Sequence, residues 1–128
     1  MVPSPVSLFA NLPEALPEER CDTLLETPGF RLERILSRGH RTPAGEWYDQ
    51  PLDEWVLLLQ GQARLTIEGR AAPLELSPGD AVHLPAHCRH RVDWTLPDCT
   101  TVWLALHFSA EAGAGPAAFS ATRQGDDL

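Results

Sequence analysis

Between residues 30 and 108 the chain consists of short apolar stretches that end at glycine or proline, with no long helical pattern. The run Glu54–Gln60 is rich in β-forming residues and ends at Gly61, and apolar and polar residues alternate along Ala63–Ile67. Ser77–Asp80 places proline and glycine at the central positions of a type II turn. Further strands are predicted at Ala81–Leu84, His90–Thr95 and Thr101–Phe108. Short strands spaced by such turns are typical of a β-sandwich or barrel.

The length of 128 residues suits one domain with a real core and is too short for two. We divide it into an N-terminal arm (residues 1–29), a barrel (30–108) and a loosely ordered tail (109–128). In the arm, Pro17–Glu26 is predicted to form a short helix. Pro17 suits the first helical position, and Cys21, Leu24 and Leu25 would form one apolar stripe. Leu8–Ala10 is a candidate edge strand.

Composition excludes several classes of function. A net charge of −8 and a pI near 4.9 remove the electrostatic basis for nucleic-acid binding. No apolar run approaches the roughly 20 residues that cross a bilayer, and the first residues do not resemble a secretory signal. The chain has no lysine, which excludes Schiff-base chemistry. The three cysteines are odd in number and widely spaced, which predicts reduced thiols in a cytoplasmic protein.

Two separated motifs carry a resemblance to a known family. Glu54 is followed by six residues and then Gly61, and Gly79, Pro85 and His90 keep a second characteristic spacing, with His87 where an inner glycine is expected. In these residues the chain resembles the cupin superfamily, small double-stranded β-helix barrels of the jelly-roll kind. The resemblance covers roughly residues 30–108. It implies an all-β fold and says little about function, because cupins include enzymes, regulators and storage proteins.

The first motif departs from the cupin pattern, which begins with histidine, a spacer and a second histidine before the acid. With three residues before Glu54, those two positions are Tyr48 and Gln50; with four, they are Trp47 and Asp49. A one-residue shift exchanges the faces of a strand, so only one pair faces the interior. The first alignment is favoured because Pro51 then stands where cupins often carry proline.

The resemblance implies a divalent transition metal, Mn, Fe, Zn or Ni, in the barrel. Glu54 and His90 would be ligands, and Gln50 or alternatively Asp49 would add an oxygen. Alternation along the strand turns His90 and Val92 inward. Replacing one imidazole by oxygen weakens the hold on nitrogen-preferring ions and favours Mn²⁺. The alternative is a barrel without metal, in which Glu54 and His90 remain as a hydrogen-bonded pair.

Three other residues are candidates for proton transfer or substrate contact: Tyr48, His87 and His107. His87 lies on a corner and could cap the pocket mouth, although packing in a turn is the commoner role. His107 shares a face with Trp103 and could act as an acid–base group near neutral pH; ordinary packing is again the alternative. The four tryptophans, Trp47, Trp55, Trp94 and Trp103, are predicted to be mainly core.

Three hypotheses of function follow. The first is a metal-dependent enzyme of the oxygenase, isomerase or lyase class that acts on a small organic molecule. The second is a non-catalytic module that binds a small ligand or a metal, such as a sensor, and the incomplete ligand set favours it more than the family name does. The third is a scaffold whose cavity is filled by side chains. The resemblance and edge-strand logic also imply a homodimer, with Leu8–Leu12 crossing to the partner.

Overall fold

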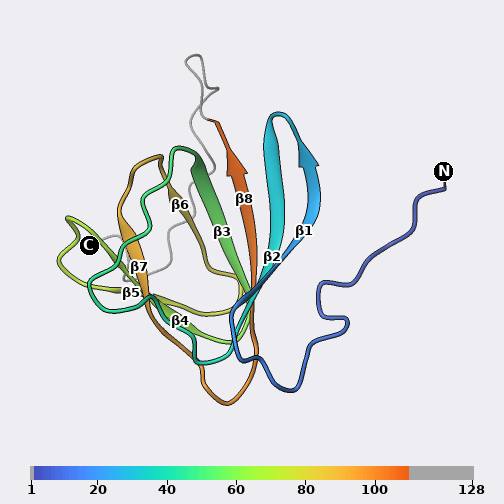
Figure 1. Ribbon diagram of the computed structural model, residues 1–128, viewed down its shortest axis with the longest axis horizontal. Coiled ribbons are helices and arrows are strands. Elements are labelled where there is room, and N and C mark those ends of the chain that lie inside the picture. Colours follow the sequence, from blue (N-terminus) through green and yellow to red (C-terminus); the bar gives the residue numbers. More distant parts are fainter. Residues whose placement is uncertain (1, 110–128) are drawn as a thin grey trace.

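The computed structural model describes residues 2–109, which form eight strands in two antiparallel sheets (Figure 1). The larger sheet has the order β1-β2-β8-β3-β6 and the smaller sheet has the order β5-β4-β7. The strands are β1 (Arg20–Thr27), β2 (Phe30–Ser37), β3 (Asp53–Gln60), β4 (Ala63–Ile67), β5 (Leu74–Leu76), β6 (Ala81–Leu84), β7 (His90–Thr95) and β8 (Thr101–Phe108). The predicted all-β jelly-roll architecture is confirmed. The predicted tail lies, apart from Ser109, outside the described residues.

The core lies between the two sheets. Val56, Leu58 and Trp103 from the larger sheet pack against Ala63 and Leu65 from the smaller one. Leu58 is fully buried, and burial of a leucine side chain stabilises a fold by about 1.5–3 kcal/mol. The alternation predicted for β4 places these residues, because every second side chain points to the same face.

The predicted helix at Pro17–Glu26 is wrong, because most of these residues form strand β1. β1 pairs with β2 in a hairpin, with Cys21 opposite Ile35, and a β-bulge shifts the register between Thr23 and Leu25. The bulge falls at Leu24 and Leu25, which are consecutive in the sequence and whose spacing from Cys21 imitates a helical stripe. Hydrogen bonding to β2 overrides this local pattern. Leu8–Ala10, proposed as an edge strand, lies in a turn.

Three of the four tryptophans are not core residues. Trp103 is buried, whereas the side chain of Trp55 is 38% exposed. The guanidinium of Arg89 lies over the ring of Trp47, and that of Arg64 over the ring of Trp94. Trp94 fails to face inward because a register shift in the pairing of β4 with β7 intervenes between it and Val92. Trp47 and Trp94 are instead cation–π partners of these arginines.

Gly61 is required by a close approach of the backbone at the end of β3. Its φ is +90°, and a Cβ atom there would lie 2.3 Å from the Thr101 Oγ1. Only glycine combines this left-handed backbone with so little space. The glycine that ends the first motif therefore allows β3 to leave the sheet beside the first residue of β8.

Candidate functional site

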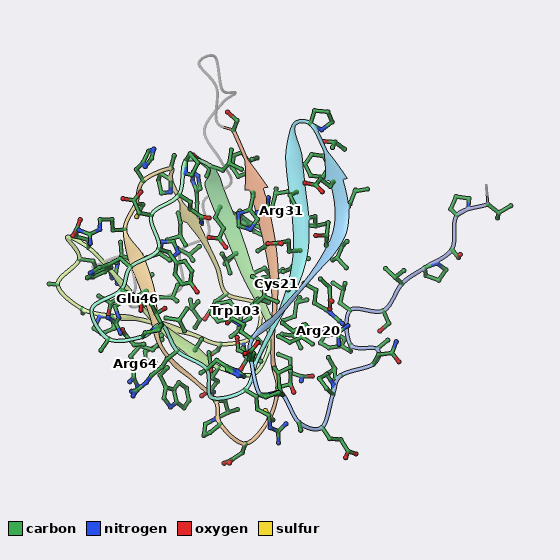
Figure 2. All side chains as sticks on the ribbon, viewed as in Figure 1. Arg20, Cys21, Arg31, Glu46, Arg64 and Trp103 are labelled. Atoms are coloured by element: carbon green, nitrogen blue, oxygen red, sulfur yellow. The ribbon has the colours of Figure 1, made fainter. Side chains whose placement is uncertain are left out.

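A cavity of about 240 Å³ lies between the two sheets and reaches the surface beside β1. One side of it, here called the apolar wall, consists of hydrophobic side chains from both sheets: Ile35, Val56, Leu65, Leu84, Val92 and Trp103. The other side, the polar wall, carries the titratable and amide groups: Glu19, Cys21, Arg31, Glu33, Tyr48, Gln50, Glu54, His90 and His107. Figure 2 shows Arg31 on β2 and Cys21 on β1. The cavity therefore offers both an apolar surface and a set of chemically active groups.

Glu54 is the central residue of the polar wall. It begins β3 on the inner face, and its side chain is only 10% exposed. Its Oε1 accepts a hydrogen bond of 2.7 Å from the Gln50 side-chain amide. The same oxygen lies 3.8 Å from His90 Nε2, while Oε2 lies 4.0 Å from His107 Nε2. The structure thus brings Glu54 and His90 into one cavity, as the sequence predicted.

The tautomer of His90 follows from its partner on the other ring nitrogen. Nδ1 lies 2.9 Å from the carbonyl oxygen of Cys88, and a carbonyl only accepts hydrogen bonds, so Nδ1 carries the proton. In the neutral ring, Nε2 then presents a lone pair toward Glu54. Two electron-pair donors therefore face each other inside the cavity at 3.8 Å, too far apart for a hydrogen bond.

The first motif adopts the alignment that the sequence favoured. Tyr48 and His90 exchange backbone hydrogen bonds of 2.7 and 3.1 Å, and their rings stack with centroids 5.5 Å apart. This pairing turns Tyr48 and Gln50 toward the cavity, where both line the polar wall. Burial raises the pKa of Tyr48, with the nearby Glu19 carboxylate adding to the shift.

Asp49 and His87 do not line the cavity. Asp49 Oδ1 and His87 Nδ1 form an ion pair of 2.8 Å on the surface, where the side chain of His87 is 70% exposed. His87 has a φ of +63°, in keeping with its position at a tight corner. Of the two roles considered for His87, the geometry shows the turn residue, and of Asp49 and Gln50 it is Gln50 that faces the interior.

His107 lines the cavity, and it brings in a carboxylate that sequence reasoning missed. His107 Nε2 lies 2.9 Å from Glu33 Oε1, and an ionised carboxylate accepts, so Nε2 donates. Nδ1 is buried and has no hydrogen-bond partner among the described residues. The signal for Glu33 was present in the sequence: it shares a strand face with Ile35, which sets a charged residue on an inward face.

The opening of the cavity is acidic. Arg31 Nε lies 3.4 Å from Glu33 Oε2, and the Arg31 side chain is 36% exposed. Cys21 belongs to the edge strand β1, and burial together with the carboxylates of Glu19 and Glu33 raises the pKa of its thiol to about 11. At neutral pH this cysteine is therefore a thiol and not a nucleophile.

Comparison with known proteins assigns the family. A profile of the cupin domain matches residues 39–107, more than half of the chain. The chain belongs to the cupin family. Two solved cupin-fold structures are similar to it: a protein of Ralstonia eutropha JMP134 described as a candidate mannose-6-phosphate isomerase (49% identity, TM-score 0.82, 84% of this chain and 100% of that chain), and a cupin superfamily protein of Desulfitobacterium hafniense DCB-2 (17% identity, TM-score 0.63, 77% and 84%).

A curated relative is an enzyme. The 3-hydroxyanthranilate 3,4-dioxygenase of Paraburkholderia phytofirmans is 34% identical over 76 residues, which cover 58% of this cupin and 41% of the dioxygenase. This cupin therefore matches less than half the length of that relative. Among the described residues no helix is long and apolar enough to cross a membrane.

Cupins commonly hold a divalent metal, and the polar wall fits one only in part. Within residues 2–109, no group of three or more His, Cys, Asp and Glu side chains is arranged to hold an ion. Glu54 Oε1 and His90 Nε2, at 3.8 Å, are spaced as two ligands of one ion would be, since ligand atoms about 2.1 Å from a metal stand about 3 to 4 Å apart. Gln50 Nε2 donates to Glu54 Oε1, so the Gln50 amide would have to turn over to add its oxygen as a third ligand. The residues fit a weakly held ion.

Proposed function

We propose that this cupin binds a divalent cation through Glu54, His90 and Gln50, and a small organic molecule in the same cavity. The observation that carries the proposal is the orientation of His90. A backbone carbonyl fixes the proton on Nδ1, and the lone pair of Nε2 faces a buried carboxylate oxygen. Histidines that bind metals are oriented in this way, through a hydrogen bond from the other ring nitrogen.

The donor set favours a hard ion. One carboxylate oxygen, one amide oxygen and one imidazole nitrogen suit Mn²⁺ better than Zn²⁺ or Ni²⁺, which gain more from nitrogen. Fe²⁺ is the alternative that the dioxygenase relative suggests. Such an ion would act as a Lewis acid toward an oxygen of the organic ligand. The chain's own residues would orient that ligand: the apolar wall would hold its body, and Tyr48 would cover it at the opening.

The relatives support a small organic ligand without defining the reaction. One carries the name of a dioxygenase and another the description of a candidate isomerase. Both names are of enzymes that convert small molecules, and the cavity volume suits a ligand of that size. We therefore carry only this common feature over to the present protein.

A second candidate function is a binding module that works without metal. The observation in its favour is the 2.7 Å hydrogen bond from Gln50 to Glu54, which already satisfies one oxygen of the buried carboxylate. In this case Gln50 replaces the ion as the partner of Glu54, and the cavity binds its ligand without converting it.

Calorimetric titration of the chelator-treated protein with Mn²⁺ distinguishes the metal-binding function from the metal-free binding module. We expect one Mn²⁺ per chain, and no measurable binding to Glu54→Gln or His90→Asn. Asp49→Asn is the matched control, because Asp49 lies four residues before β3 and faces solvent. Unchanged Mn²⁺ binding in both cavity variants, or none in the wild type, contradicts the metal proposal and leaves the binding module.

A further inference from the structure

The polar wall is rich in hydrogen-bond acceptors. Glu33 and Glu54 contribute carboxylates, and both are largely buried. His107 Nε2 donates to Glu33, so in the neutral ring the buried Nδ1 is an acceptor without a partner within residues 2–109, and Arg31 Nε is a buried donor without one. In its neutral form His90 adds Nε2 as a further acceptor. A ligand that matches this wall must supply several donors, because an unpaired buried acceptor is costly.

The charges of the polar wall also favour a ligand that supplies hydrogen-bond donors. Three carboxylates, Glu19, Glu33 and Glu54, face the cavity together with one guanidinium, that of Arg31, which is already paired with Glu33. The Cys21 thiol also lines the cavity, and its pKa is raised first by burial and then by the carboxylates, among them Glu19, Glu33 and Glu54. The cavity therefore has a negative potential that opposes phosphate or carboxylate groups and attracts cations.

Size limits the ligand further. A cavity of 150 Å³ lined by apolar side chains accepts benzene. The present volume of about 240 Å³ leaves room for one ring and a short substituent. The apolar wall provides a surface for such a ring, and the groups around Glu33 provide a polar end at the β2 side of the cavity.

We propose that the organic ligand of this cavity is a one-ring molecule that bears a protonated amine, and that Glu33 is the carboxylate that recognises the amine. This inference rests on the cavity being the ligand site, as proposed above, but not on the metal. Glu54 Oε1 accepts from Gln50 and faces His90. Glu33 Oε1 accepts from His107, but Oε2, 3.4 Å from Arg31 Nε, accepts no hydrogen bond from it, and the Glu33 side chain is the more exposed of the two. An ammonium there donates to Glu33, while His107 Nε2 lies 2.9 Å from Glu33 Oε1 and 4.0 Å from Glu54 Oε2.

Calorimetry with two isosteric probes tests the charge. Benzylamine is a cation at pH 7, and benzyl alcohol has the same ring and length but no charge. We expect benzylamine to bind the chelator-treated full chain at least 10-fold more tightly than benzyl alcohol. Benzoate should bind more weakly than either. In Glu33→Gln the benzylamine advantage should fall to less than 3-fold, with binding of benzyl alcohol unchanged.

Glu68→Gln is the matched control, because Glu68 pairs with Arg89 on the surface and should leave both affinities unchanged. Equal affinities for the two probes in the wild type, preference for benzoate, or no binding of either probe overturns the inference. So does an amine preference that survives Glu33→Gln in a variant with wild-type melting temperature. Mn²⁺ titration of the same samples keeps the two proposals apart, because Mn²⁺ binding without an amine preference overturns only the present one.

Discussion

Asp53 and Glu54 are neighbours on β3, and they meet their histidines in different ways. Asp53 is buried on the face of β3 away from the cavity, where its Oδ2 lies 2.7 Å from His83 Nε2 and its Oδ1 accepts from the Ala86 backbone N–H. Glu54 faces inward, and 3.8 Å separates it from His90. The outer pair is a closed contact in which each partner satisfies the other. The Glu54–His90 pair is open, because two hydrogen-bond acceptors face each other across 3.8 Å without a hydrogen bond.

The distance between carboxylate and imidazole distinguishes a structural pair from a candidate metal site. The Asp53–His83 contact closes to hydrogen-bond distance, as do the surface Asp49–His87 pair at 2.8 Å and the Glu33–His107 pair at 2.9 Å inside the cavity. The inner groups are held apart by contacts that fix them separately, Gln50 for Glu54 and the Cys88 carbonyl for His90. Groups that are positioned individually and left facing each other indicate a ligand.

The largest expected effect is the loss of Mn²⁺ affinity on replacing the Glu54 carboxylate. Glu54→Gln should weaken Mn²⁺ binding on the order of 1,000-fold, about 4 kcal/mol, because an amide replaces the only carboxylate ligand. Asp53→Asn, one residue earlier, should leave Mn²⁺ affinity within a factor of two. Electron paramagnetic resonance of free Mn²⁺ measures both. Equal losses in the two variants would mean that the inner carboxylate has no special role.

The reactivity of the Cys21 thiol reports the electrostatic potential of the cavity. Because the pKa of its thiol is raised to about 11, alkylation by iodoacetamide at pH 8 should be about 100-fold slower in the native protein than in urea. Glu33→Gln should speed the native reaction several-fold, while Glu26→Gln, which removes an exposed carboxylate on β1, should not. Mass spectrometry of the Cys21 peptide gives the rates, and equal rates in the two variants would contradict the acidic cavity.

Gly61 and Gly69 both have a positive φ but differ in the space available for a Cβ atom. Gly61→Ala should lower the free energy of unfolding by about 2–3 kcal/mol, because its Cβ would meet Thr101 and the φ is positive. Gly69→Ala has a similar φ of +92° and nothing within 4 Å, so about 1 kcal/mol is expected. Urea denaturation measures both free energies. A cost for Gly69→Ala as large as that for Gly61→Ala would show that backbone strain alone decides.

The smallest effect concerns the outer pair. His83 and the Ala86 N–H lower the pKa of Asp53 below its ordinary value of 3.8. A lowered carboxyl pKa adds stability above pH 3.8 that is lost as the pH falls through the folded value. His83→Ala should therefore lower the melting temperature by a few degrees at pH 5 and by less at pH 2.5. A difference that is constant over this range would contradict the ion pair.

Much of the architecture could be predicted from local chemistry. Gly61, Gly79 and Pro85 are turn residues whose backbone requirements are written in the sequence, and alternation places Leu65, Glu54 and His90 on inner faces. The helix prediction failed at β1 because an edge strand has little buried surface to impose a period, and its bulge disturbed what remained. Trp94 was misplaced for a related reason, since the register shift between it and Val92 cannot be read from alternation.

Local sequence was enough to predict the alternation of polar and apolar residues along the strands, the turns and the family. It also singled out Glu54 and His90, the two residues at the centre of the candidate site. Only the tertiary structure decided that Gln50 and not Asp49 enters the cavity, that His87 leaves it, and that Glu33 joins His107 there. The physical reason is that these choices depend on register and on contacts between strands far apart in the chain. Glu33 and His107 are separated by 74 positions and meet only because β2 and β8 pair.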